Sequence, residues 1–381
     1  MEVDVSPCAS AARTKPRTRI RPFEREDAER WEAFVARSGQ ATFFHRIGWR
    51  EVIQDIFRHR ACHLLAEREG EIVGVLPLFE MKSLLFGRAL VSSPFCVYGG
   101  PVADDIETER LLIDAAVEVA RSREVDHLEL RNRSPKRDDW PRQDLYVTFT
   151  TELESDPEAN LLAVPRKQRA MVRKGIKHGL KSELDASVDR FFRLYADNVH
   201  RHGTPPLPKR YFARLKAVFG DCCEVLTVLD PRGEPVSGVL SFYFKNQVLP
   251  YYAGDTPQAR DFAANDFKYW ELMRRACERG IRIFDYGRSK RDTGSFAFKK
   301  NWGFEPSPLF YEFHLLKGGA VPANNPLNPK YRTLIAVWRR LPLRVANALG
   351  PHIVRGALRS WRWRSRPVGS LRSTGRPWSR S

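Results

Sequence analysis

The chain reads Ile281-Arg282-Ile283-Phe284-Asp285-Tyr286-Gly287-Arg288-Ser289 late in its second half, and Phe296-Ala297-Phe298-Lys299-Lys300-Asn301-Trp302-Gly303-Phe304 follows after a short loop. The first stretch alternates apolar and polar residues as a strand does, and it stops at a glycine. We therefore expect Arg288 and Ser289 to lie on a loop beyond the end of a strand. Because a strand end rich in charge, glycine and aromatic residues presents chemistry rather than core, this loop is the first candidate for a site.

One pattern of elements occurs twice along the chain. Each copy consists of a hairpin, a third strand, an amphipathic helix and a fourth strand, as judged from apolar spacing and turn residues. Two copies of such a unit predict two α/β domains of one kind. In the first copy we expect a hairpin at residues 64–79, a strand that closes at 98–101, a helix at 111–121 and a strand at 128–130. In the second copy we expect a hairpin at 225–243, a strand that closes at 251–255, a helix at 269–279 and a strand at 283–285.

A chain of 381 residues is long enough for two domains that each bury a core. Its start is polar and has no apolar run, which predicts neither a signal peptide nor a membrane span. Residues 84–103 form the longest mostly apolar stretch, but turn residues interrupt it, so two strands are expected there rather than a transmembrane helix. We expect a disordered arm at residues 1–18, the first domain at 19–155, the second at 156–318 and a tail at 319–381.

The six cysteines and nine histidines are scattered and show no CxxC or metal-ligand spacing. This pattern predicts no metal site. Without a secretion signal, the cysteines are expected to be free thiols in a reducing cytoplasm.

Positive charge is concentrated in the tail. The formal net charge is +18, and 13 of the 64 Lys and Arg residues lie from Lys330 onward, where no Asp or Glu occurs. The first part of the tail is also apolar, contains tryptophan and is expected to be helical. Such a segment suits an anionic membrane interface, which residues 331–366 would contact. Two alternatives stay open: a helical pair that covers the second domain, and contact with nucleic acid.

A second basic cluster lies between the two repeats. The helix expected there ends at Gly179 and carries Arg166, Arg169, Arg173 and Lys177 on one face, at spacings of three and four residues. Like charges on one face repel, and a phosphate or diphosphate neutralises them well because arginine forks match phosphate oxygens. The cluster is therefore either a binding surface for such a group or a solvated helix face.

The segment at residues 285–304 resembles the C-terminal signature of the FemAB-like transferases, with Asp285-x-Gly287-Arg288-Ser289 and Gly294-x-Phe296-x-Phe298-Lys299-Lys300-x-Trp302-Gly303-Phe304. In particular, residues 20–350 resemble FemAB-related proteins that accompany exosortase and exopolysaccharide loci in Gram-negative bacteria. The resemblance implies an α/β fold of two tandem GNAT-like (acyl-CoA N-acyltransferase-like) domains, each a mixed central sheet flanked by helices. It also implies transfer of an acyl or aminoacyl group to an amine of a cell-envelope or exopolysaccharide precursor.

Transfer of an acyl group to an amine requires a hold on the donor carbonyl, a stabiliser for its oxyanion and a path for the amine proton. The resemblance implies that Phe298 and Lys299 meet the acyl donor, with Lys299 in the electrostatic role. Asp285 is expected either to act as the base or amine-orienting carboxylate, or to cap the loop around Gly287. Further substrate-binding residues are expected from the loop and from neighbouring strand ends: Tyr251, Tyr252, Asp255, Arg288 and Ser289.

CoA-using GNAT proteins usually carry a Gln/Arg-x-x-Gly-x-Gly/Ala loop whose backbone amides cradle the pyrophosphate. The corresponding segments here, residues 104–108 and 259–266, lack it, which disfavours acetyl-CoA. The resemblance implies an aminoacyl-tRNA as the donor, a partner that a positive surface suits, and no tightly bound cofactor. The chain lacks the helical coiled-coil arm of some FemA-type members, so an acyl thioester of CoA or of a carrier protein stays an alternative donor.

These features predict a cytoplasmic acyl or aminoacyl transferase for a nucleotide- or lipid-linked envelope precursor, peripheral on the inner membrane if the tail binds it. One alternative is a thioester-dependent N-acyltransferase acting on a nucleotide- or lipid-linked amino sugar. The other is a non-catalytic, membrane-peripheral scaffold.

Overall fold

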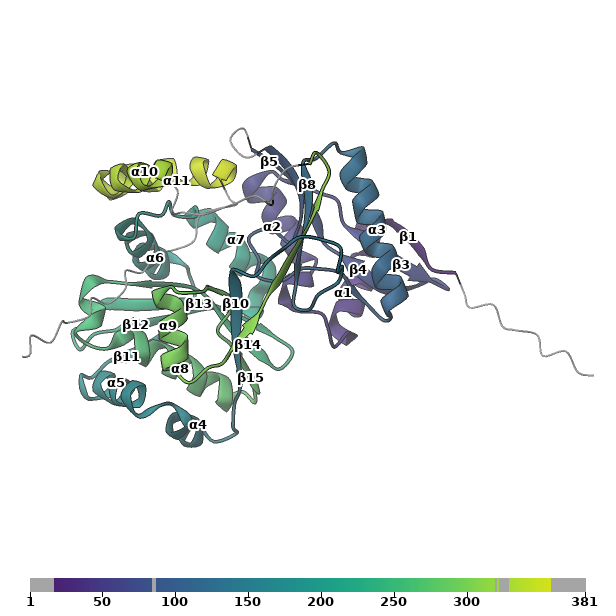
Figure 1. Ribbon diagram of the computed structural model, residues 1–381. Coiled ribbons are helices and arrows are strands. Elements are labelled where there is room, and N and C mark those ends of the chain that lie inside the picture. The colour runs from purple at the N-terminus through teal and green to yellow at the C-terminus, as the bar shows by residue number, and fades with distance from the viewer. Residues whose placement is uncertain (1–16, 84–86, 319–320, 322–328, 358–381) are drawn as a thin grey trace, which may run out of the picture.

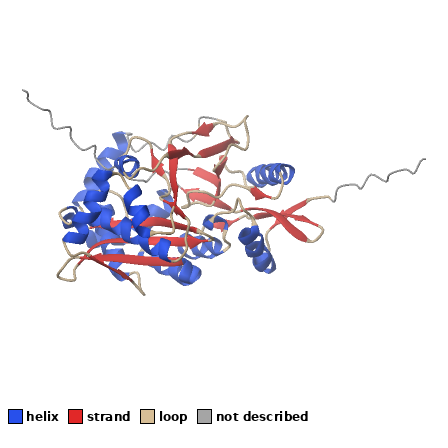
Figure 2. Ribbon diagram, turned by 90° about the horizontal axis from the view of Figure 1, so that it is seen from below, coloured by secondary structure: helices blue, strands red, loops and turns tan. Residues whose placement is uncertain are grey.

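The computed structural model describes residues 17–83, 87–318, 321 and 329–357. Two α/β halves lie side by side, the first in purple and blue and the second in teal and green (Figure 1). Most helices gather at the end of the molecule that holds the second half (Figure 2). Most of the expected N-terminal arm, residues 1–16, lies outside the described residues.

The first half contains two sheets. A four-stranded antiparallel sheet has the order β1-β3-β4-β7, and a six-stranded sheet has the order β2-β5-β6-β8-β18-β9. Strand β18 (Phe310–Leu315) comes from late in the chain. In the larger sheet β6 and β8 are parallel and the other neighbours are antiparallel. The elements are β1 (Arg19–Pro22), α1 (Ala28–Arg37), α2 (Gly48–Phe57), β2 (Arg60–Ala61), β3 (Leu64–Arg68), β4 (Glu71–Leu76), β5 (Leu78–Ser83), β6 (Gly87–Ser92), β7 (Val102–Ala103), α3 (Ile106–Ser122), β8 (His127–Asn132) and β9 (Arg142–Gln143).

The second half is built on one eight-stranded sheet. Its order is β11-β12-β13-β14-β15-β10-β16, and β17 also pairs with β10. Strands β14 and β15 are parallel, whereas the other neighbours are antiparallel. The elements are β10 (Tyr146–Glu152), α4 (Pro157–Ala163), α5 (Arg166–Lys177), β11 (Lys181–Leu184), α6 (Asp189–Arg201), α7 (Lys209–Phe219), β12 (Cys223–Leu229), β13 (Pro235–Phe244), β14 (Gln247–Asp255), α8 (Ala264–Glu278), β15 (Ile283–Asp285), β16 (Ser289–Lys290), α9 (Gly294–Asn301), β17 (Pro306–Pro308) and β18 (Phe310–Leu315).

The two halves exchange one strand each. Strand β10 comes after β8 and β9 in the chain but pairs with β15, and β18 comes after β15, α9 and β17 but pairs with β8. Each half therefore completes the sheet of the other, and Figure 1 shows both strands crossing between them. The boundary proposed at residue 155 falls after β10, a strand that belongs by its pairing to the second sheet.

The repeat expected from the sequence is present as the hairpins β3–β4 and β12–β13, followed in each half by a helix and a parallel strand. The strand end expected at residues 98–101 is wrong, because β6 already ends at Ser92 and residues 93–101 form a loop. Ser93 and Phe95 adopt positive φ angles of 38° and 69°, which take the chain out of the sheet after β6. In the second half, residues 251–255 do belong to a strand, β14.

One aromatic core joins the halves. Phe43 stacks on Phe242 with ring centroids 4.3 Å apart, and Trp49 lies 5.3 Å from Phe219. All four side chains are buried in a cluster that combines α2 with α7 and the second sheet. Burial of this much apolar surface across the boundary holds the halves together in one unit.

The tail forms α10 (Pro329–Arg340) and α11 (Leu343–Ala357), which pack on α6. Trp338 is 5% exposed, so it packs inward and does not lie at an outer interface as expected for the tail tryptophans. Trp361 and Trp363 lie outside the described residues. The pair thus covers the second half, but it also leaves large apolar side chains exposed: Val337, Leu343, Val345, Leu349 and Ile353.

Candidate active site

A cavity of about 510 Å³ lies where β14 and β15 diverge. The two strands pair only at Gln247 and Val248, and β14 then runs on to Asp255 beside β13. The gap is bordered by α6, α8 and α9 and, from the first half, by the middle of the loop after β6 and by β8. Such a space between diverging parallel strands and two domains is a usual place for a ligand.

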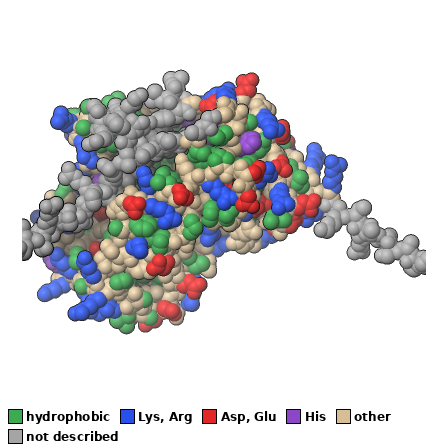
Figure 3. Space-filling model, viewed as in Figure 1, with side chains coloured by type: hydrophobic (Ala, Val, Ile, Leu, Met, Phe, Trp, Pro, Cys, Tyr) green, Lys and Arg blue, Asp and Glu red, His purple; other side chains and the backbone are tan. Residues whose placement is uncertain are grey.

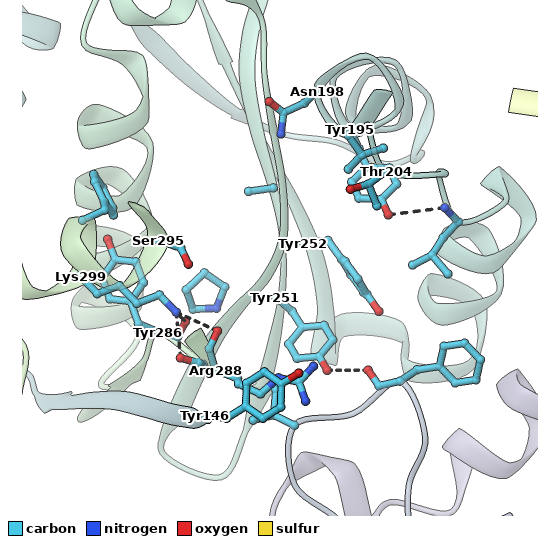
Figure 4. A pocket seen from close by; sticks show the side chains of 18 of the residues that line it. Tyr146, Tyr195, Asn198, Thr204, Tyr251, Tyr252, Tyr286, Arg288, Ser295 and Lys299 are labelled. Atoms are coloured by element: carbon cyan, nitrogen blue, oxygen red, sulfur yellow. Dashed lines mark hydrogen bonds between the residues drawn. The ribbon is translucent and has the colours of Figure 1, made fainter. Parts of the chain in front are cut away.

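Adjacent tyrosines of β14 border this cavity. Tyr252 pairs with Leu240 and Pro250 pairs with Ser241, which leaves Tyr251 as the extra residue of a β-bulge. In a regular strand neighbouring side chains point to opposite faces, whereas the bulge lets both tyrosines reach the cavity. The Tyr251 hydroxyl donates to the Phe95 carbonyl across the two halves at 2.8 Å (Figure 4).

Lys299 holds the loop that follows β15. Its Nζ donates to the carbonyl oxygens of Tyr286, Gly287 and Arg288 at 2.6, 2.8 and 3.3 Å. The side chain is 8% exposed and borders the cavity from α9. Three carbonyls on one ammonium group use its three hydrogens and place a positive charge in the cavity wall.

Asp285 fixes the same loop from the other side. Its carboxylate accepts from the Gly287 amide at 2.8 Å, the Tyr98 hydroxyl at 3.0 Å and the Thr148 hydroxyl at 3.2 Å. Burial raises the pKa of this carboxyl, and the Gly287 and Tyr98 hydrogen bonds oppose the rise. Asp285 is 3% exposed and lies outside the cavity lining, which matches the loop-capping alternative better than a base. Gly287 itself has φ of 67°, a conformation that glycine adopts without strain.

Arg288 points into the cavity between the two exchanged strands. Its guanidinium lies 4.4 Å from the ring centroid of Tyr146 on β10, and Nη1 donates to the Tyr311 hydroxyl on β18 at 2.8 Å. The two tyrosine rings are themselves 5.4 Å apart. Figure 4 shows Arg288 and Tyr146 together at one side of the cavity, with Tyr251 next to them.

Asp255 is a second charged group of the wall. Its Oδ1 accepts from the Lys268 ammonium at 2.8 Å and from the Ser237 hydroxyl, and its side chain is 25% exposed. The preceding Gly254 permits close approach of α6, because a Cβ atom there would lie 2.4 Å from the Tyr195 amide nitrogen. The strand and helix that carry the wall are thus in direct backbone contact.

The sequence candidates divide into those that border the cavity and those that do not. Ser289 is buried in β16, and Arg166, Arg169 and Arg173 lie on α5, outside the lining. The residues that do border the cavity are Tyr251, Tyr252, Asp255, Arg288, Phe298 and Lys299.

The structure adds lining residues that sequence reasoning missed. Besides Tyr286 of the motif at residues 284–289, the additions include Ser295 of the second motif and residues of expected strands and helices, none of which the sequence marked as site residues. They are Glu129, Arg131, Tyr146, Tyr195, Asn198, Tyr269, Ser295 and Tyr311.

Helix α5 faces solvent with six basic residues. Arg166, Arg173 and Lys177 are exposed, and Arg169 donates to the Leu162 carbonyl at 2.8 Å. Within the described residues, no ion pair involves the basic side chains of this helix. Figure 3 shows Lys and Arg side chains gathered at the lower left, over α5.

In the described part of the chain, no group of three or more His, Cys, Asp or Glu side chains is placed to hold a metal ion. Among the helices that the structure describes, none has the length and hydropathy needed to cross a bilayer.

Known proteins resemble this chain in sequence and in fold. Residues 166–300 match the acetyltransferase (GNAT) domain family. A segment of 91 residues is 31% identical to the lipid II:glycine glycyltransferase of Staphylococcus epidermidis, and it spans 22% of each protein. The crystal structure of FemX superposes with a TM-score of 0.62 and 17% identity, covering 83% of this chain and 100% of FemX. The chain is similar to the FemAB-like transferases.

A tandem GNAT protein from the clavulanic acid biosynthesis pathway superposes with a TM-score of 0.50 and 14% identity, covering 80% of this chain and 100% of that protein. This likeness and that of FemX concern the fold. The protein therefore has the tandem GNAT-like α/β fold that the sequence predicted, and its resemblance to FemAB-like transferases is confirmed.

Proposed function

We propose that this FemAB-like protein transfers an aminoacyl group to an amine of a cell-envelope precursor. The observation that carries the proposal is the loop at residues 286–288, whose carbonyls are gathered on Lys299 beside a tyrosine-rich cavity. The similarity to a lipid II:glycine glycyltransferase and the GNAT domain support the reaction class and the kind of acceptor. An exopolysaccharide precursor is an alternative acceptor, and an acyl thioester is an alternative donor.

In the proposed step the acceptor nitrogen attacks the carbonyl carbon of the aminoacyl ester. A C–N bond forms, the C–O bond to the tRNA ribose breaks, and the amine proton ends on the departing hydroxyl. Negative charge develops on the carbonyl oxygen, and the positive charge of Lys299 stabilises it. Because three carbonyls accept from Nζ, Lys299 acts through its charge and through the shape of the loop.

A direct hydrogen bond to that oxygen is assigned to the hydroxyl of Tyr286. This hydroxyl is buried, and no described group accepts from it or donates to it. Burial raises its pKa well above the ordinary value, so it stays protonated and able to donate. Asp255, the partly exposed carboxylate of the wall, orients the amine in this scheme, while Asp285 fixes the loop.

Helix α5 is the proposed contact for the tRNA donor. Its six basic residues carry no described ion pair, and an RNA backbone would neutralise them. His178 at the end of the helix lies 5.8 Å from Phe262, in the segment that leads from β14 into α8 at the cavity. The surface is thereby linked to the wall of the proposed active site.

The tail is the proposed contact for an anionic membrane, which would keep the protein peripheral on the cytoplasmic face. Val345, Leu349 and Ile353 follow one another at four-residue spacing and are 38–46% exposed. Arg339, Arg340 and Arg344 flank them, and neither helix contains an acidic residue. Ile353 also borders the cavity, so a bilayer at this face would lie beside its opening.

The proposal is tested by incubating the purified protein with charged tRNA pools or acyl-CoA and with a lipid-linked or nucleotide-linked amine acceptor. Formation of an amide that requires charged tRNA is the expected result. Product from acyl-CoA alone would favour the thioester alternative. A protein that forms no amide with any donor while remaining folded would support the scaffold alternative.

A further inference from the structure

Arg288 differs from the other charged residues of the cavity in its partners. Glu129 and Arg131 form an ion pair at 2.8 Å, Asp255 pairs with Lys268 at 2.8 Å, and Lys299 is held by backbone carbonyls. No carboxylate in the described residues lies within ion-pair distance of Arg288. Its Nε is buried and has no hydrogen-bond partner there. The guanidinium therefore carries an uncompensated charge and an unused donor in a ligand-sized cavity.

The position of this guanidinium is fixed on several sides. The backbone carbonyl of Arg288 accepts from Lys299 at 3.3 Å, and the side chain lies over Tyr146 and donates to Tyr311. The Tyr311 hydroxyl in turn donates to the Val97 carbonyl at 2.8 Å. An arginine held on an aromatic ring loses little freedom when it binds, so it is suited to grip a planar or tetrahedral oxyanion.

Burial of an unpaired guanidinium is costly unless an anion accompanies it. The surrounding tyrosines supply hydroxyl donors but no negative charge at neutral pH. Resting on the proposed function, we propose that Arg288 binds an oxyanion of the substrate, a phosphoryl or carboxylate group, at the junction of the exchanged strands. Because Tyr146 comes from β10 and Tyr311 from β18, this subsite exists only when both halves are assembled.

The subsite is tested on the full chain by calorimetric titration with inorganic diphosphate and, separately, with acetate at low salt. Arg288→Met should lower the affinity for the bound probe by tenfold or more, the range for a lost charge-assisted hydrogen bond. Arg133→Met is the matched control. The Arg133 guanidinium also lies over a tyrosine ring, 5.4 Å from the ring centroid of Tyr98, but Arg133 is outside the cavity lining. This variant should change the affinity less than twofold.

Binding of diphosphate alone would identify a phosphoryl subsite, and binding of acetate alone a carboxylate subsite. Binding of neither probe by the unmodified protein, or equal binding by Arg288→Met, would overturn the proposal. If Arg288→Met does not fold, Arg288→Lys decides, because it keeps the charge without the planar fork. Several-fold weaker binding by that variant supports the subsite, and unchanged affinity contradicts it.

The titration and the transfer assay fail in different ways. If the probe binds through Arg288 but no donor supports transfer, the subsite is supported and the proposed function is contradicted. If Arg288→Met still catalyses transfer with an unchanged KM for the acceptor, the proposed function is supported and the subsite is contradicted.

Discussion

The two halves build the same parallel strand pair and continue from it differently. In the first half β6 stops at Ser92, and the segment that follows folds back so that the amides of Gly99 and Gly100 both donate to the Arg131 carbonyl at 3.1 Å. A Cβ atom on Gly100 would lie 1.9 Å from the Asn132 side chain, so this filling is close-packed. In the second half β14 continues to Asp255 while β15 ends, and the gap is the cavity.

The two halves thus share one topology. In the first half the chain fills the space beside the parallel strands, and this half supports the fold. In the second half the space stays open and forms the candidate site. The proposed contacts for donor and membrane, α5 and the tail, also belong to the second half or pack on it. Changes there are expected to affect transfer or binding. Changes in the buried interior of the first half, away from the cavity lining, are expected to affect stability alone.

The largest effect is expected at Lys299. Lys299→Ala should lower turnover by roughly 10²-fold or more, the range for loss of one oxyanion-stabilising group. It should also lower the melting temperature, because three carbonyls lose their donor. The neighbouring Lys300 is exposed, and Lys300→Ala should behave like the unmodified protein in both measurements. Turnover within threefold of normal for Lys299→Ala would remove the residue from the proposed mechanism.

The next effect concerns His45 in the first half. Burial lowers its pKa from the ordinary 6.5 to about 4, while hydrogen bonds to Gly100 and Thr42 oppose the shift. The unfolded chain therefore takes up the proton first, so stability is present above pH 6.5 and is lost as pH falls toward 4. Between pH 7 and pH 5 this residue should account for about 2 kcal/mol.

The measurement is urea unfolding across that pH range, with diphosphate binding as the functional readout. His45→Gln should make the dependence of unfolding free energy on pH less steep and leave probe binding at pH 7 unchanged. The slope that remains is assigned to His63, because burial also lowers the pKa of that residue, to about 3. An equally steep dependence in the variant would mean that other groups cause the acid destabilisation.

A smaller effect is expected on α5. Arg169→Glu combined with Arg173→Glu should weaken tRNA binding by about tenfold and reduce its salt dependence, because two phosphate contacts are lost. Arg110→Glu combined with Arg121→Glu on α3 is the control, since it makes the same charge change on an exposed helix of the first half. Equal weakening by the two double variants would indicate a general charge effect and no specific surface.

The smallest effect is expected on the tail. Leu349→Gln should weaken binding to anionic vesicles about fivefold, since one exposed apolar side chain contributes on the order of 1 kcal/mol on insertion. Leu184→Gln on β11 is the control, because Leu184 is 42% exposed and Leu349 is 46% exposed. Flotation with vesicles at low and high salt is the measurement. Full-length protein that ignores anionic vesicles at low salt would leave the tail with its packing role on α6 alone.

The elements themselves could be predicted because their signals are local. Apolar spacing located α3 and α8, turn residues located both hairpins, and the glycine at residue 287 marked a strand end with an ordered loop. The pairing of β10 and β18 could not be predicted, since alternation within a strand does not say which sheet it joins. Tyr146 and Tyr311 were therefore missed.

Contacts at the site were predictable only in part. The sequence placed Lys299 near the loop at residue 287, but not the three carbonyls that accept from it. Helical spacing predicted which residues of α5 share a face. It does not specify which element lies beside that face, and so the sequence did not predict that the basic residues lie outside the cavity lining. The strand expected to close at residues 98–101 ends instead at Ser92, because the apolar composition of this segment does not reveal the positive φ angles of Ser93 and Phe95.

The exchange of β10 and β18 agrees with a specific evolutionary origin and predicts how the two halves depend on each other for folding. A single-domain ancestor that swapped its last strand with a second copy would, after duplication and fusion of its gene, have this connectivity. Cutting the chain between Glu152 and Pro157 would yield two fragments, each of which carries a strand of the other's sheet. Neither fragment should be recovered folded when expressed alone, whereas co-expression should give a heterodimer with the native arrangement.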